Sequence, residues 1–237
     1  MKLAWLTIPI LALVTACGGS DKADTVANPP PATATAVPTA PRADATAAAT
    51  PTESAIDPGV LSNAVLELSD MPGGFSVSAP GESSDDDDIC SNVAAAAAKT
   101  PQNTATVTFG QSDFGPFIIQ QVDLYKSRSD ASAALESVRD SFKKCGPTWT
   151  DAQTPPTTWN IVALNFPKLG DDAFAVRVSS KDIPFFGTAQ VDYVFSRRGA
   201  ALNVVAYAAI GPVVGAASPL EDLAKKADAK LTKAGIR

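Results

Sequence analysis

Apolar and polar positions along the chain follow two periods, and these periods predict the helices and strands. Alternation with a period of two is typical of half-buried strands and runs through Thr104–Phe109 and Val191–Ser196. Further strands are expected over 75–78, 117–125, 159–164, 174–179 and 202–206. Short turns join consecutive strands, which favours antiparallel pairing.

Apolar residues spaced three and four positions apart predict four helices, over 58–68, 86–99, 129–145 and 219–234. In the third helix, Leu135, Val138 and Phe142 fall on one face. The expected fold class is α+β, an antiparallel sheet with helices packed on one face and one disulfide. Its length suits one domain, residues 58–237.

Composition removes several function classes. The 237 residues include no histidine, which excludes Ser-His-Asp and Cys-His nucleophiles and His-ligated zinc or haem. A net charge of -6 argues against a nucleic-acid partner. No catalytic residue, metal or cofactor is therefore expected. Carboxylates alone can run glycoside hydrolysis, but no acid here stands in a context that indicates that role.

The N-terminus has the pattern of an export signal. Lys2 precedes the apolar run Leu3–Ala16, which is too short for a membrane-spanning helix of about 20 residues. The run ends in Val14–Cys17, which resembles the lipobox of bacterial lipoproteins. The resemblance implies removal of residues 1–16, a lipid on Cys17 and an extracytoplasmic, lipid-anchored position at the cell membrane. An ordinary secretory signal cleaved near Ala16 is the alternative.

Residues 17–57 form a predicted tether behind the lipidated cysteine. Of the 38 positions from 20 to 57, 25 are Ala, Thr or Pro and none is aromatic. Such a composition offers too little apolar surface to offset chain entropy, so a disordered spacer is expected.

Two cysteines remain once Cys17 carries a lipid. Thiols left over in an exported protein are expected to pair, so a disulfide between Cys90 and Cys145 is predicted. A redox pair is the alternative, but the Cys-x-x-Cys spacing is missing.

Five segments of the folded part carry a family resemblance: Leu68–Phe75, Val122–Leu135, Cys145 before Gly146-Pro147, Leu169–Ala173 and Arg197–Val205. In these segments the chain resembles the PknH-like extracellular sensor domains of actinobacterial kinases and lipoproteins. The resemblance implies an antiparallel sheet with helices on one face and a cleft for a small ligand. Two features depart from the kinase sensors: they have two disulfides where one is possible here, and this chain has no kinase segment. The PsbP-like/Mog1-like lipoproteins have a similar element order.

Aromatic residues at expected strand connections are the candidate binding residues. Phe185 and Phe186 stand where two strands are joined, Phe114 lies in a similar stretch, and Trp159 flanks a proline-rich loop. They either pack beneath the sheet edge or line an apolar surface for a ligand or partner.

Two acidic segments have competing interpretations. The run Asp85–Asp88 invites a calcium site, but calcium loops alternate their carboxylates around a glycine, and a helix N-terminus also favours acids. Gly170–Asp172 is interpreted as a turn into a strand rather than an acidic site.

Together these features predict a membrane-anchored extracytoplasmic lipoprotein. Its sensor-like domain is expected to bind a small apolar or amphipathic ligand without catalysis. The alternative is an envelope structural or interaction protein that docks another protein through the apolar loop at Phe185 and Phe186.

Overall fold

The computed structural model describes residues 58–79, 100–112, 115–151, 155–183, 186–211 and 218–237. The signal segment 1–16, the tether 17–57 and the predicted helix 86–99 lie outside the described residues and stay predictions.

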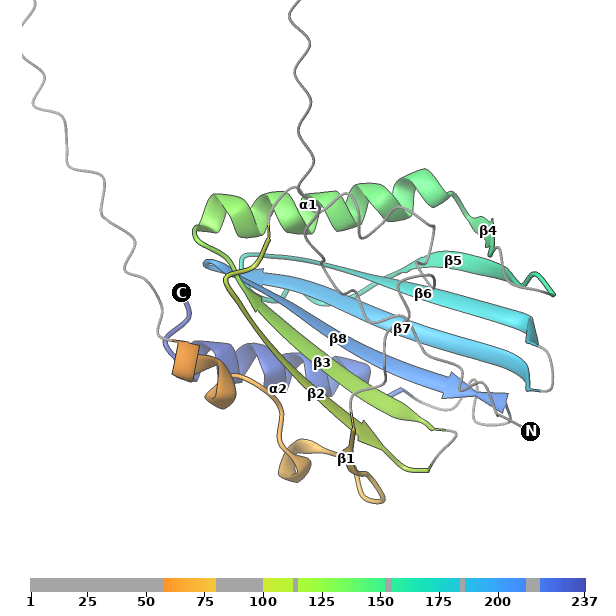
Figure 1. Cartoon of the computed structure of the whole chain (residues 1–237), viewed down its shortest axis with the longest axis horizontal. Helices are drawn as coiled ribbons and strands as arrows, with labels where there is room; N and C mark the ends of the chain where they lie inside the picture. The colour runs from red at the N-terminus through yellow and green to blue at the C-terminus, as the bar shows by residue number, and fades with distance from the viewer. Residues whose placement is uncertain (1–57, 80–99, 113–114, 152–154, 184–185, 212–217) are drawn as a thin grey trace, which may run out of the picture. The chain divides into compact units, whose positions relative to one another are not determined.

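One antiparallel sheet organises the molecule (Figure 1). Its strands are β1 (Ser76–Ser78), β2 (Asn103–Gly110), β3 (Phe117–Leu124), β4 (Thr148–Thr150), β5 (Thr158–Leu164), β6 (Asp172–Ile183), β7 (Gly187–Arg198) and β8 (Ala201–Ile210). They lie in the order β1-β2-β3-β8-β7-β6-β5-β4, with every neighbouring pair antiparallel. The α+β class and the antiparallel pairing are confirmed.

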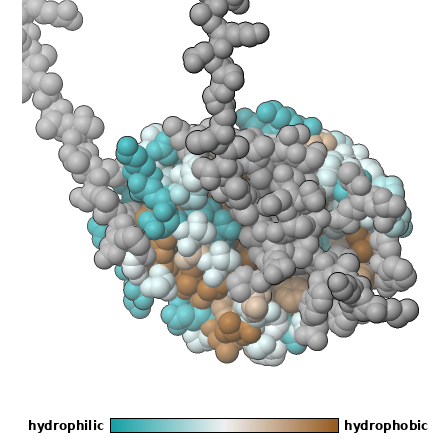
Figure 2. Space-filling model, in the orientation of Figure 1, coloured by the Kyte–Doolittle hydropathy of each residue, from teal (hydrophilic) through white to brown (hydrophobic). Residues whose placement is uncertain are grey.

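The two edges of the sheet are short three-residue strands, β1 and β4. Short edge strands limit pairing with other chains. Figure 2 shows hydrophobic surface around β1 and β2, where Val77 is 69% exposed. β4 pairs only with the first part of β5, up to Asn160, and one further bond joins Ile161 N–H to the Pro147 carbonyl at 2.9 Å. The second half of β5 has no strand on its outer side within the described part of the chain.

Two helices form where the apolar spacing predicts them. In α1 (Arg128–Cys145), the Ser127 hydroxyl accepts a bond from Asp130 N–H and caps the first turn, and Gly146 follows the last residue at a φ of 75°. In α2 (Leu220–Lys233), the buried stripe is Leu220, Leu223, Ala224, Ala227 and Leu231. Acidic residues in the first turn and lysines in the last complement the dipole of α2.

The helices lie on opposite faces of the sheet, so the expectation of helices on one face is wrong (Figure 1). α1 packs on Val176, Tyr193 and Phe195, whereas α2 packs on their alternate neighbours such as Ala175 and Val194. Successive side chains of a strand point to opposite faces, and both sets are buried here. Strands buried on both sides require a cover on each face, which one helix layer cannot provide. We call the two sides the α1 face and the α2 face.

The helix expected over 58–68 is also wrong. The segment forms two 3₁₀ helices, η1 (Pro58–Asn63) and η2 (Leu68–Asp70), separated by an irregular stretch. In that stretch Leu66 N–H donates to Gln120 Oε1 on β3 at 2.6 Å, and a donor used this way is lost to an α-helical ladder. Leu61, Ala64 and Val65 are still buried, on the α2 face beside Leu231.

Candidate functional site

A cleft of about 840 Å³ lies between the second half of α1 and the strands β5 and β6. Its lining comes from α1 and the chain that follows it, from the end of β5 with its loop, and from the start of β6. The lining residues are Arg139, Phe142, Lys143, Gly146, Pro147, Ile161, Ala163, Leu164, Asn165, Phe166, Pro167, Lys168, Asp171, Asp172, Ala173, Phe174, Ala175 and Val176. Most are apolar, and the volume is that of a small-molecule site, about 300–1,000 Å³.

Aromatic rings build one wall of the cleft. Phe174 of β6 stacks on Phe195 of β7 with ring centroids 4.9 Å apart, and Phe142 of α1 meets Phe174 edge-on at 6.4 Å. Such offset and edge-on contacts stabilise a fixed ring arrangement. Phe195 is buried behind the pair, so the cleft has a packed apolar wall.

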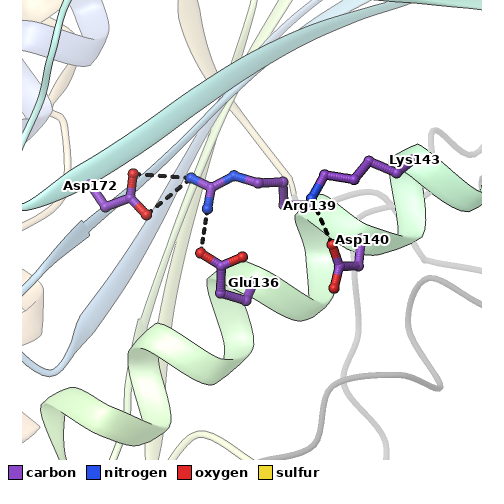
Figure 3. A network of polar contacts seen from close by, with 5 residues as sticks. All are labelled: Glu136, Arg139, Asp140, Lys143 and Asp172. Carbon is purple, nitrogen blue, oxygen red and sulfur yellow. Dashed lines mark hydrogen bonds and ion pairs between the residues drawn. The ribbon is translucent and has the colours of Figure 1, made fainter.

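Arg139 connects α1 to the start of β6 (Figure 3). Its Nη2 donates to both carboxylate oxygens of Asp172 at 3.0 Å, its Nη1 pairs with Glu136, and its guanidinium carbon lies 4.9 Å from the Phe174 ring centroid. Burial lowers the pKa of Arg139, but the bonds and charges of Asp172 and Glu136 outweigh burial and hold that pKa above its usual value. The arginine is thus a fixed part of the cleft wall.

The carboxylate of Asp171 is hydrogen-bonded to the turn between β7 and β8. Its Oδ2 accepts from Arg197 Nη1 and from Gly199 N–H, both at 2.9 Å. The preceding Gly170 has a φ of 54°, and a Cβ there would lie 2.3 Å from the Arg197 carbonyl oxygen. Only glycine fits this approach. The interpretation of Gly170–Asp172 as a turn into a strand is therefore confirmed.

Of the aromatic residues chosen from the sequence, the two that the structure describes, Trp159 and Phe186, are not part of the cleft lining. Phe186 is half-buried in the β6–β7 turn, at the opposite end of β6 from Asp172. Trp159 lies on the α1 face two residues before Ile161, and its Nε1 donates to Asp151 Oδ2 at 3.1 Å. Phe114 and Phe185 lie outside the described residues.

Of the three cysteines predicted to carry a lipid or form a disulfide, Cys145 is among the described residues. Cys145 is the last residue of α1, directly before Gly146 of the cleft. Cys17, Cys90 and the acidic run Asp85–Asp88 lie outside the described residues. The Cys90–Cys145 pairing stays a prediction that non-reducing peptide mapping can check.

Sequence patterns did not indicate the basic residues of the cleft lining, which are Arg139, Lys143 and Lys168. Arg139 and Lys143 lie on α1, whereas Lys168 lies on the loop after β5, and no local pattern joins the helix to that loop. One usable signal was Asn165–Lys168, where an aromatic residue and a proline stand in the connection between two expected strands.

Neither a membrane-crossing helix nor a metal site is found in the described part of the chain. No helix there combines the length and apolar character that a membrane span needs. Likewise, no group of three or more acidic, cysteine or histidine residues there is arranged to hold a metal ion.

No protein-family model matches the chain, and no curated protein matches its sequence. Among solved structures, the extracellular domain of PknH from Mycobacterium tuberculosis is similar with a TM-score of 0.45 and 15% identity. The match covers 69% of this chain and 78% of that domain.

Proposed function

We propose that this chain is a membrane-anchored extracytoplasmic lipoprotein whose folded part captures a small apolar or amphipathic ligand. The cleft between α1, β5 and β6 carries the proposal. Its size and its largely apolar lining favour affinity from buried surface, with a few polar groups for selectivity.

The polar content of the cleft favours binding over turnover. Its lining has no Ser, Thr, Cys, Tyr or His among the described residues, so none of these nucleophiles is present there. Both carboxylates are held by arginines, Asp171 by Arg197 and Asp172 by Arg139. An acid held in an ion pair is poorly placed to exchange protons with a substrate.

The anchor rests on the lipobox-like Val14–Cys17 and the proline-rich chain behind it. Two or more acyl chains on one residue are enough for stable membrane attachment. A Cys17→Ser chain is expected to leave the membrane fraction and to lack the mass of a lipid-bearing N-terminal peptide. Retention of this variant on membranes would show that the lipid assignment is wrong.

Filling the cleft tests the ligand proposal. Ala163 is an exposed residue of β5 that lines the cleft, and Val162 beside it points to the other face with 55% exposure. Ala163→Phe is therefore expected to occlude the cleft, whereas Val162→Phe adds the same ring to the same strand outside it. Phenylalanine suits strand positions, so both variants should fold.

The measurement uses the exported full chain with Cys17→Ser, which permits titration without detergent. The probe is N-phenyl-1-naphthylamine, an uncharged fluorophore that brightens in apolar sites. Saturable binding is expected, weakened by about tenfold in Ala163→Phe, the effect of some 1.4 kcal/mol of lost contact. Val162→Phe should bind as the parent does. Absent saturation, or equal binding by the two variants, contradicts the proposal.

A further inference from the structure

The charges around the cleft differ in whether the protein itself neutralises them. Asp172 is paired with Arg139 and Asp171 with Arg197. Arg139 is in turn engaged by Glu136 and lies against the Phe174 ring. These groups have their partners within the fold, so none of them calls for a charged ligand.

The two lysines of the lining are different. Lys143 is 65% exposed, and among the described residues its one ion pair is with Asp140, an exposed acid three residues earlier on α1 (Figure 3). Exposed pairs of this kind contribute little stability and open readily. Lys168, on the loop between β5 and β6, is exposed and has no ion pair with any described residue. Two positive charges therefore stand available at the cleft of a chain whose net charge is -6.

We propose that the ligand is an amphipathic anion, whose apolar body lies against Ile161, Phe174 and Val176 and whose anionic group meets Lys143 and Lys168. This inference rests on the proposed function and specifies the ligand chemistry of the same cleft. An acidic protein that keeps exposed lysines beside an apolar wall attracts anions locally while repelling them elsewhere. An apolar wall also lowers the local dielectric and strengthens the attraction of each lysine for an anion.

A cationic ligand fits the same residues poorly. It would meet Lys143 and Lys168 in the lining, and the carboxylates of Asp171 and Asp172 that would attract it already accept hydrogen bonds from arginines. A wholly uncharged ligand would leave both lysines without a role in recognition.

Two probes with one aromatic body test the inference. 8-Anilinonaphthalene-1-sulfonate carries a sulfonate, and N-phenyl-1-naphthylamine has the same rings without it. In the full chain with Cys17→Ser, the sulfonate probe is expected to bind more tightly than the uncharged one. The preference should shrink at 1 M salt, where the screening length falls to about 3 Å.

Lysine variants locate the preference. Lys143→Gln and Lys168→Gln are each expected to weaken sulfonate binding about fivefold and to leave the uncharged probe unchanged. Lys144→Gln is the matched control, because Lys144 is exposed beside Lys143 on α1 and does not line the cleft. All three positions are exposed, and unchanged melting temperatures are expected to confirm intact folding.

The outcomes separate the two proposals. Equal binding of both probes, still blocked by Ala163→Phe, overturns the anion inference and leaves the ligand-binding function standing. Equal loss of sulfonate binding in Lys144→Gln also overturns the inference, because the effect is then one of general charge. If neither probe binds saturably, the proposed function itself falls.

Discussion

Beneath α2 the sheet is closely packed, whereas beside α1 a cleft opens at the end of β5 and the start of β6. On the α2 face, Arg198 binds Asp228 through two hydrogen bonds of 2.9 and 2.6 Å, and Lys230 lies 3.1 Å from Asp70 of η2. These contacts hold α2 against the sheet and against the N-terminal segment. On the α1 face, the Arg139–Asp172 contact joins α1 to β6 beside a cleft rather than over a filled core.

Similar ion pairs thus have different consequences on the two faces. Where apolar surface is filled on both sides, as around Leu223 and Val194, a charge pair fixes the position of a helix. Where strands extend beyond the helix, the same kind of pair becomes part of the wall of a cleft. The open area follows from geometry, because α1 covers β7 and β8 and leaves the ends of β5 and β6 less covered.

The largest expected effect on stability comes from truncating a buried side chain between α2 and the sheet. Leu223 of α2 is 1% exposed, so Leu223→Ala should lower the free energy of unfolding by about 2–5 kcal/mol. Ala163→Phe on the open side should change it by no more than about 0.5 kcal/mol. Urea unfolding of both variants measures the contrast. A small loss for Leu223→Ala would mean that α2 does not close its face.

Two glycines test the close packing of the β7–β8 turn against the C-terminal residue. Gly199 has a φ of 55°, and a Cβ there would lie 2.0 Å from the Arg237 carbonyl oxygen. Gly187 has a φ of 74° with open space around its Cβ position. Gly187→Ala should cost about 1 kcal/mol from backbone strain, and Gly199→Ala about 2 kcal/mol or more because the chain must also move. Equal melting temperatures for the two variants would contradict the close approach.

The smallest expected effect is a difference in pH dependence between the faces. Burial raises the pKa of Asp123 on the α1 face, and this outweighs the hydrogen bonds from Thr104 and Gln121. Burial also raises the pKa of Asp70, but the Glu67 backbone N–H and Lys230 outweigh it and hold that pKa below the usual 3.8.

The two signs are opposite. The contribution of Asp123 to folding stability is fully present below pH 3.8 and is lost as the pH rises through its raised pKa in the folded protein. The contribution of Asp70 is present above pH 3.8 and is lost as the pH falls through its lowered pKa in the folded protein. Relative to the parent, Asp123→Asn should therefore gain stability as pH rises from 4 toward 7. Asp70→Asn should be less stable than the parent near neutral pH, and this difference in stability should disappear as the pH falls through the lowered pKa of Asp70. If the stability of the parent, Asp123→Asn and Asp70→Asn changed with pH in parallel, the predicted difference between Asp123 and Asp70 would be wrong.

The strands and the two long helices were predictable because their patterns are local. Alternation over Thr104–Phe109 and the stripe of α1 depend only on which neighbours share a face. The opposite placement of the helices had a signal as well. β8 is buried along nearly its whole length, and its near-continuous apolar run Ala201–Ile210 is typical of a strand covered on both sides.

The cleft was not predictable in the same way. Arg139 comes to line the same cleft as Ala163 and Lys168 only through the crossing of α1 over the sheet, which no sequence period encodes. The short β4 was missed because three residues are too few to show alternation. The first helix was misjudged because the bond of Leu66 to Gln120 joins residues far apart in the chain.

The order of strands also constrains when the chain can fold. β3 pairs with β8 from Phe117 opposite Ala208 to Leu124 opposite Ala201, so the ladder that unites the two halves of the sheet depends on one of the last segments to be synthesised. Closing so long a loop costs chain entropy, and this cost slows folding. Until β8 emerges, the hairpin of β2 and β3 presents an unsatisfied backbone edge, and a nascent chain in that interval is most exposed to misassembly with its copies.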